Sequence, residues 1–300
     1  MNIIASPRLT PPYITYHLDL PLSRLHVLES GKGEPLIIVP ATISELRDWR
    51  NLAQFMAQWF KVYFFELPGH GESSAFPGKF SSHRVADLVC QMVDKLGHSR
   101  FNLMGFSFGG ILAMRTFKLL SDRIDRLVMI APCLGQTALP ISRLRWSLLF
   151  HGNRLLSHPR VQQRFVDLIH SPRTISMMVK ALQKIGKLEV TIPLQDKLPR
   201  ASAGTISVLN AQIEEILTTE FKNGSKKHDT PCYFAMSIRD PLLRFDVTEQ
   251  ILQSHFSSVN TVRLDYPFHQ PPAPFTFDEL NRDFGETVEA FLRPRSQPVV

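Results

Sequence analysis

The chain has 300 residues, of which 44% are hydrophobic and 20% are charged, so it can bury a sizeable core and is not intrinsically disordered. Its 34 Lys and Arg residues exceed its 27 Asp and Glu residues, which gives a net charge of +7. No apolar run approaches the roughly 20 residues of a membrane-spanning helix, and residues 1–12 do not have the pattern of a signal peptide.

The cysteines indicate the redox setting of the protein. Cys90, Cys133 and Cys232 are odd in number and far apart, which matches neither a disulfide framework nor the spacing of zinc ligands. We therefore expect a reducing, cytoplasmic location. The sequence contains no metal cluster, phosphate-binding loop or dinucleotide fingerprint, so no cofactor is expected.

Strands and helices alternate in the first 133 residues. Short apolar patterns predict strands over 14–20, 24–28, 35–40, 62–67, 101–105 and 127–132. Apolar residues at helical spacing predict helices over 44–60, 85–96 and 108–120. Such alternation is typical of a parallel sheet that is covered by helices on both faces.

The alternation stops over residues 134–230, where the segments are helical or irregular, and it then resumes. The last part of the chain predicts strands over 232–238 and 259–264 and helices over 247–256 and 277–292. We therefore expect one α/β core, formed by residues 1–133 and 231–300, with an insertion over 134–230.

The insertion also carries the net charge of the chain. Residues 134–230 hold 14 basic and 7 acidic side chains, whereas the two flanking parts carry +3 and −3. A solvated basic face explains this charge, and the alternative is attraction of an anionic carrier (coenzyme A or acyl carrier protein) or of a membrane surface. Nucleic acid is not favoured, because no recognised binding module is present. The basic residues include Arg143, Arg145, Arg154, Arg160, Arg164, Arg173, Lys180, Lys184, Lys187, Lys197 and Arg200.

The strongest motif is the G-x-S-x-G pattern of residues 105–109, with Ser107 at its centre. It follows a predicted apolar strand and precedes a predicted helix, which is the setting that a nucleophile elbow needs. The small residues permit a sharp turn that lifts Ser107 above the edge of the sheet. The helix that follows points its N-terminal N–H groups at the same place.

A serine hydroxyl is a weak nucleophile that needs a base, and the base must be oriented by an acid. Asp240 and His269 each come just after a predicted strand near the end of the chain. The carboxyl ends of parallel strands are where functional residues collect in such sheets, and the order Ser-acid-His fits this architecture. We therefore expect Ser107, Asp240 and His269 to form a catalytic triad.

Two further segments are similar to motifs of a known protein family. Residues 66–73, with the sequence ELPGHGES, are similar to a D-x-P-G-H-G-x-S turn, and residues 39–49 match the segment after the third strand. On these motifs the chain resembles cap-bearing proteins of the α/β-hydrolase superfamily, of the epoxide-hydrolase and esterase-like kind. The resemblance implies a mostly parallel eight-stranded sheet flanked by helices, the triad roles above, and a mainly helical cap inserted after the sixth strand.

The segment after the third strand departs from the family pattern. The family has His-Gly-x there, and the residue x supplies an N–H to the oxyanion hole, whereas this chain has Pro40-Ala41-Thr42. By position, Thr42 and Phe108 are the expected N–H donors, with Ala41 as the alternative to Thr42. Glu66 stands where the family usually has Asp, so a carboxylate is kept at that turn.

These residues predict a serine hydrolase that cleaves an ester, thioester or related acyl bond of a small apolar substrate. The aspartate nucleophile of epoxide hydrolases is replaced by serine, so their chemistry is not implied. Phe106 and Trp146 are candidates to line the acyl pocket.

Two alternatives use the same scaffold. One is a C–C bond hydrolase with the same triad, and the other is a non-catalytic ligand-binding protein, which the altered segment 40–42 favours and the intact triad opposes.

Overall fold

One eight-stranded sheet forms the centre of the molecule. The computed structural model describes residues 10–42, 45–171, 173–174, 176–177, 201–221, 226–271 and 274–292. The strands are arranged in the order β1-β2-β4-β3-β5-β6-β7-β8. Their bounds are Tyr13–Asp19 (β1), Arg24–Ser30 (β2), Pro35–Val39 (β3), Lys61–Phe65 (β4), Phe101–Phe106 (β5), Ile124–Ile130 (β6), Cys232–Ser237 (β7) and Val259–Leu264 (β8).

Most of the sheet is parallel, as expected from the sequence. β2 pairs antiparallel with both β1 and β4, whereas all other neighbouring strands pair in parallel. The carboxyl ends of β3, β5, β6, β7 and β8 therefore lie along one edge of the sheet, where sites form in α/β folds.

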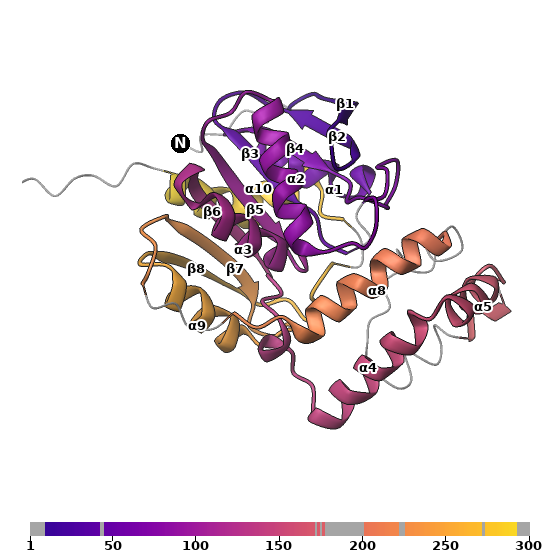
Figure 1. Ribbon diagram of the computed structural model, residues 1–300. Helices are drawn as coiled ribbons and strands as arrows, with labels where there is room; N and C mark the ends of the chain where they lie inside the picture. The colour runs from indigo at the N-terminus through magenta and orange to yellow at the C-terminus, as the bar shows by residue number, and fades with distance from the viewer. Residues whose placement is uncertain are drawn as a thin grey trace, which may run out of the picture.

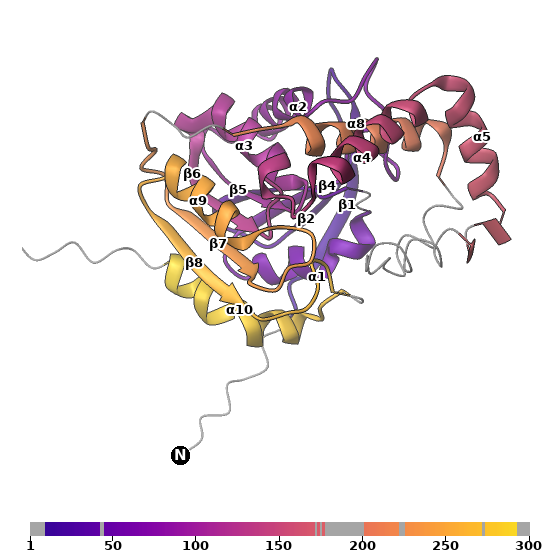
Figure 2. The same ribbon diagram turned by 90° about the horizontal axis from the view of Figure 1, so that it is seen from below.

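Helices cover both faces of the sheet (Figures 1 and 2). Successive side chains of a strand point to opposite faces, so Leu103 of β5 packs into one hydrophobic cluster and Met104 into the other. The Met104 cluster includes α1 (Leu46–Met56) and α10 (Phe277–Leu292). The Leu103 cluster includes α2 (Ser82–Lys95), α3 (Gly109–Leu120) and α9 (Phe245–His255).

All the predicted strands and helices of the core are present, and their ends differ by a few residues. β6 begins at Ile124 and not at Leu127, because Ile124 pairs with Phe101 at the start of β5. α1 ends at Met56 and not at Phe60, because the chain turns there to enter β4. The first difference comes from strand pairing and the second from a turn, and local propensity marks neither of these ends sharply.

A helical cap lies between β6 and β7, within the predicted insertion. Its described helices are α4 (Arg143–Leu156), α5 (Pro159–Ile169) and α8 (Ala203–Thr218). α8 lies between α4 and the core, so that α4 is an outer helix of the cap (Figure 1). Five of the basic residues singled out above, namely Lys180, Lys184, Lys187, Lys197 and Arg200, are outside the described residues.

α8 attaches the cap to the core through polar contacts. A carboxylate oxygen of Glu215 accepts a hydrogen bond from the backbone N–H of Ser82, at the start of α2, over 2.7 Å. The side chain of Gln212 lies 3.1 Å from Nε2 of His70, and both residues are buried. An anion at a helix N-terminus is favourable, so Glu215 also stabilises the start of α2.

Close packing at the start of α3 generates a stability prediction. A Cβ atom at Gly109 would lie 2.6 Å from the carbonyl oxygen of Val39, which is backbone in a buried strand and has no room to move. We expect Gly109→Ala to lower the free energy of unfolding by about 1–3 kcal/mol through overpacking. Thermal unfolding followed by circular dichroism would measure this loss.

Gly152→Ala is the matched control, since a Cβ there meets nothing within 4 Å. Gly152 lies inside α4, where Ala is the better helix former by about 1 kcal/mol. This variant should therefore unfold at the same temperature or higher. Equal melting temperatures for Gly109→Ala and the unsubstituted protein would contradict the packing argument.

Candidate active site

Ser107 occupies a strained turn between β5 and α3. Its backbone has φ of 52°, in the left-handed region that non-glycine residues rarely adopt. Its N–H donates to the carbonyl of Ile130 over 3.2 Å, and its own carbonyl accepts from the N–H groups of Gly110 and Cys133, each over 2.8 Å. These bonds hold the turn in place and present the serine hydroxyl at the edge of the sheet.

The structure brings Ser107, His269 and Asp240 into one hydrogen-bonded series. Nε2 of His269 lies 2.8 Å from Oγ of Ser107, and Nδ1 of His269 lies 2.7 Å from Oδ2 of Asp240. The carboxylate is an acceptor only, so Nδ1 donates to it and Nε2 is left to accept the serine proton. The Asp240 side chain is 1% exposed and that of His269 is 9% exposed, so water competes little for these bonds.

Asp240 is oriented by the backbone of its own loop. Its Oδ1 accepts from the N–H of Leu242 over 2.8 Å and from the N–H of Leu243 over 3.0 Å. Its other oxygen is therefore directed at His269. A carboxylate held in this way can fix the imidazole tautomer and stabilise an imidazolium.

Aromatic rings support the imidazole from one side. The ring of Phe106 stacks on His269 with centroids 5.7 Å apart, and Trp49 packs against Phe106 at 4.9 Å. The sequence pattern indicates Phe106 as a pocket residue, whereas Trp49 falls inside the predicted helix over 44–60 and has no predicted role at the site. No local signal distinguishes Trp49 from an ordinary core residue, because its contact with Phe106 depends on how α1 packs on the sheet.

An apolar cavity of about 110 Å³ lies between the sheet and helices α1 and α10, and Ser107, His269 and Asp240 are not among its lining residues. Phe106 and Gln270, the sequence neighbours of Ser107 and His269, form part of its wall, together with Trp49 and residues of α1 and α10. Trp146 is not among the residues that line this cavity. Its indole N–H donates to the carbonyl of Leu217 over 2.8 Å, which places it in the α4–α8 contact of the cap.

The predicted oxyanion donors lie on the two segments that flank the serine. Phe108 directly follows Ser107 and is the N-cap residue of α3, so its N–H is at the positive end of a helix. Ala41 and Thr42 come shortly after Val39, which pairs with Gly105 in the sheet register. The chain at 41–42 therefore leaves the sheet beside the Ser107 turn.

Comparison with known proteins identifies the fold family. The alpha/beta hydrolase fold family matches residues 34–172. The chain has the α/β-hydrolase fold. The solved structure of a membrane phospholipase A aligns with 93% of this chain, and the alignment covers 86% of the phospholipase chain. The TM-score is 0.66 and the sequence identity is 19%, so the two proteins share a fold.

Curated members of the superfamily match part of the chain. A soluble epoxide hydrolase from Corynebacterium sp. (strain C12) is 25% identical over 135 residues, which are 43% of this chain and 47% of that protein. A pimeloyl-[acyl-carrier protein] methyl ester esterase from Nitrosomonas europaea is 25% identical over 122 residues, or 39% and 45% of the two chains. The chain thus spans less than half the length of these two relatives.

The superfamily turn at 66–73 carries Glu66 in place of Asp, and the structure shows what this carboxylate does. Glu66 is buried and accepts from the N–H of Leu46, at the start of α1, over 3.0 Å and from the N–H of Glu72 over 2.7 Å. Its Oε2 also lies 3.1 Å from Nδ1 of His26. Glu66 thus joins the turn to α1, the helix that follows segment 40–42.

No group of three or more His, Cys, Asp or Glu side chains among the described residues is arranged to hold a metal ion. No helix in the same part of the chain has the length and apolar character needed to cross a membrane.

Cys133 lies beside the site but is not a competing nucleophile. Burial raises the pKa of its thiol to about 11, so the thiol stays protonated at pH 8. We expect iodoacetamide at pH 8 to leave Cys133 unmodified in the folded protein and to alkylate it in guanidinium, as measured by peptide mass spectrometry. Cys90, which is only partly buried, is the internal control and should be alkylated first. Alkylation of folded Cys133 as fast as Cys90 would contradict this.

Proposed function

We propose that the protein is a serine hydrolase that cleaves ester or thioester bonds of apolar acyl substrates. Ser107 is the nucleophile, His269 the general base and acid, and Asp240 the group that orients the imidazole. The observation that carries the proposal is the hydrogen-bonded series from Ser107 Oγ through His269 to Asp240. A hydroxyl, an imidazole and a carboxylate in this order are the elements of acyl transfer through a covalent intermediate.

In the first half of the reaction, Ser107 Oγ attacks the carbonyl carbon while its proton moves to Nε2 of His269. Asp240 stabilises the imidazolium that forms, and the N–H groups of Phe108 and of Thr42 or Ala41 stabilise the oxyanion. The imidazolium then gives its proton to the leaving alcohol or thiol. The C–O or C–S bond breaks, and the acyl group stays on Ser107.

In the second half, a water molecule takes the place of the leaving group. His269 removes a proton from this water, which attacks the acyl carbon, and then returns the proton to Ser107 Oγ. The free acid leaves, and the serine hydroxyl is restored. Loss of one oxyanion donor should slow turnover by about 10²–10³-fold.

The surroundings of the series support an apolar acyl group and a reducing location. The aromatic rings of Phe106 and Trp49 beside the imidazole favour an apolar acyl group over a charged one. The methyl ester esterase relative supports an ester as the bond. We place the activity in the cytoplasm, because Cys90, Cys133 and Cys232 are all free thiols.

Replacement of the nucleophile gives the main test. Ser107→Ala should lower the hydrolysis of a short p-nitrophenyl ester by at least about 10³-fold and abolish labelling by a fluorophosphonate probe. Ser99→Ala is the matched control, because Ser99 is exposed and comes just before β5, at the other end of the strand that precedes Ser107. A wild-type protein that the probe does not label would favour the non-catalytic ligand-binding alternative.

The orienting carboxylate can be tested separately. Asp240→Asn preserves the shape of the side chain but favours the wrong tautomer of His269, so kcat should fall by about 10⁴-fold. Asp265→Asn is the control, since the Asp265 side chain is 70% exposed and pairs with Arg239 away from the imidazole. Steady-state kinetics with the same ester measures both variants. A kcat for Asp240→Asn equal to that of the control would refute the assigned role.

A further inference from the structure

The outer face of α4 carries three exposed leucines, and the exposed His151 lies between two of them. Leu144, Leu148 and Leu155 are 71%, 66% and 62% exposed. At 3.6 residues per turn, positions 144, 148 and 155 fall on one side of a helix. We call these three residues the leucine stripe. It extends over about 16 Å, at 1.5 Å per residue.

The inner face of α4 is identified by its contacts with α8. The indole N–H of Trp146 donates to the Leu217 carbonyl over 2.8 Å, and the side-chain amide of Asn153 donates to the Asn210 carbonyl over 2.9 Å. Trp146 and Asn153 lie on the opposite side of the helix from the leucine stripe. The stripe therefore points away from α8 and the core, and its exposure follows from how the helix is docked.

Exposed apolar side chains are concentrated in this part of the molecule. Of the eleven large apolar side chains that are exposed in the described chain, six lie between residues 144 and 177. Single exposed leucines are ordinary on protein surfaces, whereas several exposed apolar side chains on one face of a helix mark a surface that meets an apolar partner.

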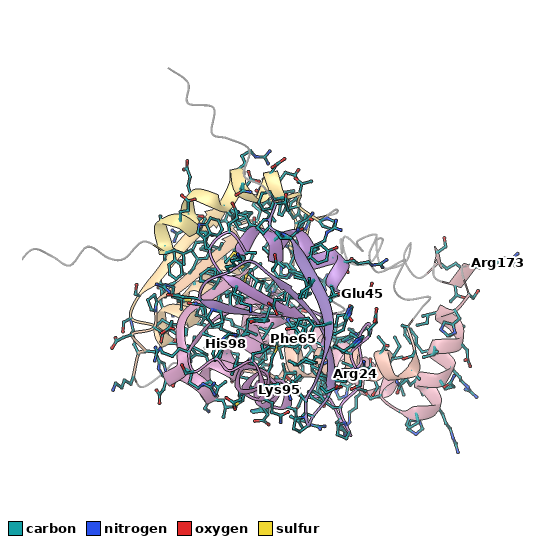
Figure 3. All side chains as sticks on the ribbon, turned by 90° about the horizontal axis from the view of Figure 1, so that it is seen from above. Arg24, Glu45, Phe65, Lys95, His98 and Arg173 are labelled. Carbon is teal, nitrogen blue, oxygen red and sulfur yellow. The ribbon has the colours of Figure 1, made fainter. Side chains whose placement is uncertain are left out.

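Arginines border the leucine stripe on both sides. On the helix, Arg143 and Arg154 fall to one side of the stripe and Arg145 to the other. All three are exposed, and none forms an ion pair with a residue in the described ranges. Residues 141–173 contain six arginines and a single acidic residue, Asp167. At the far end of the cap, Arg173 projects away from the core (Figure 3).

We propose that the leucine stripe and its arginines dock the protein on an anionic lipid surface. Leucines that enter the boundary between headgroups and acyl chains are removed from water, while arginines at both edges pair with lipid phosphates or carboxylates. A second copy of the chain fits the surface less well, because it would bring like-charged arginines together. An acidic carrier protein would match the charge but need not supply an apolar face. The docking surface does not involve Ser107, so it is separate from the proposed hydrolysis.

Co-sedimentation with sucrose-loaded vesicles tests the proposal. One set of vesicles contains about 30% phosphatidylserine in phosphatidylcholine, and the other is phosphatidylcholine alone, since a polybasic surface prefers anionic lipid. We expect the wild-type protein to bind the anionic vesicles more tightly and to release them as the salt concentration rises. The Ser107→Ala variant should bind as the wild type does, which separates docking from catalysis.

Two groups of substitutions identify the residues involved. The combined change Leu144→Gln, Leu148→Gln and Leu155→Gln keeps helix propensity and should weaken binding to anionic vesicles by at least about tenfold. Neutralising the three arginines to Gln should weaken it by about a hundredfold, with little effect on neutral vesicles. The control replaces Leu119 and Leu242 with Gln. These two leucines are exposed and lie outside the cap, so this variant should bind like the wild type. Circular dichroism and thermal unfolding verify that each variant is folded.

Three outcomes would overturn the proposal. The first is a wild-type protein that does not sediment with anionic vesicles. The second is a folded leucine variant that binds them as tightly as the wild type. The third is a protein that does not bind vesicles and instead binds another protein through this surface. Sedimentation velocity could show a dimer that the leucine substitutions dissociate, which would assign the surface to a second copy of the chain. Binding of an acidic acyl carrier protein would assign it to that carrier.

Discussion

The left-handed backbone of Ser107 is the constraint on which the rest of the site depends. A non-glycine residue in this conformation costs about 1–3 kcal/mol and persists only where its surroundings hold it. Here the N–H and carbonyl of Ser107 are both bonded to neighbouring segments, and α3 starts so close to β3 that Gly109 has no room for a side chain. The sheet thus supplies the stability that keeps the serine hydroxyl in reach of His269.

Helix α8 holds the cap to this core, and α4 lies on the side of α8 that faces away from the core. Glu215 and Gln212 attach α8 to the start of α2 and to the 66–73 turn, and Glu66 continues this connection to the start of α1. α4 packs on the far side of α8 and carries the leucine stripe. The cap therefore has one face that is built into the core and another that meets the surroundings.

Much of the candidate site could be predicted because it depends on local pattern. The small residues around Ser107 and the apolar strand before it mark a sharp turn, and the strands before Asp240 and His269 end at the same edge of a parallel sheet. The position of Phe106 between Trp49 and His269 could not be predicted in the same way. It joins three segments that are distant in sequence, and each aromatic residue taken alone is typical of a core.

Residue types along the chain are enough to predict the alternation of strands and helices, the position of the insertion and its basic charge. The assembled fold sets the distances between Ser107, His269 and Asp240, since residues 162 and 29 positions apart meet only when the sheet is formed. It also decides which side of α4 is exposed. Both sides of that helix carry apolar residues, and only the docking of α8 against one of them leaves the leucines of the other in water.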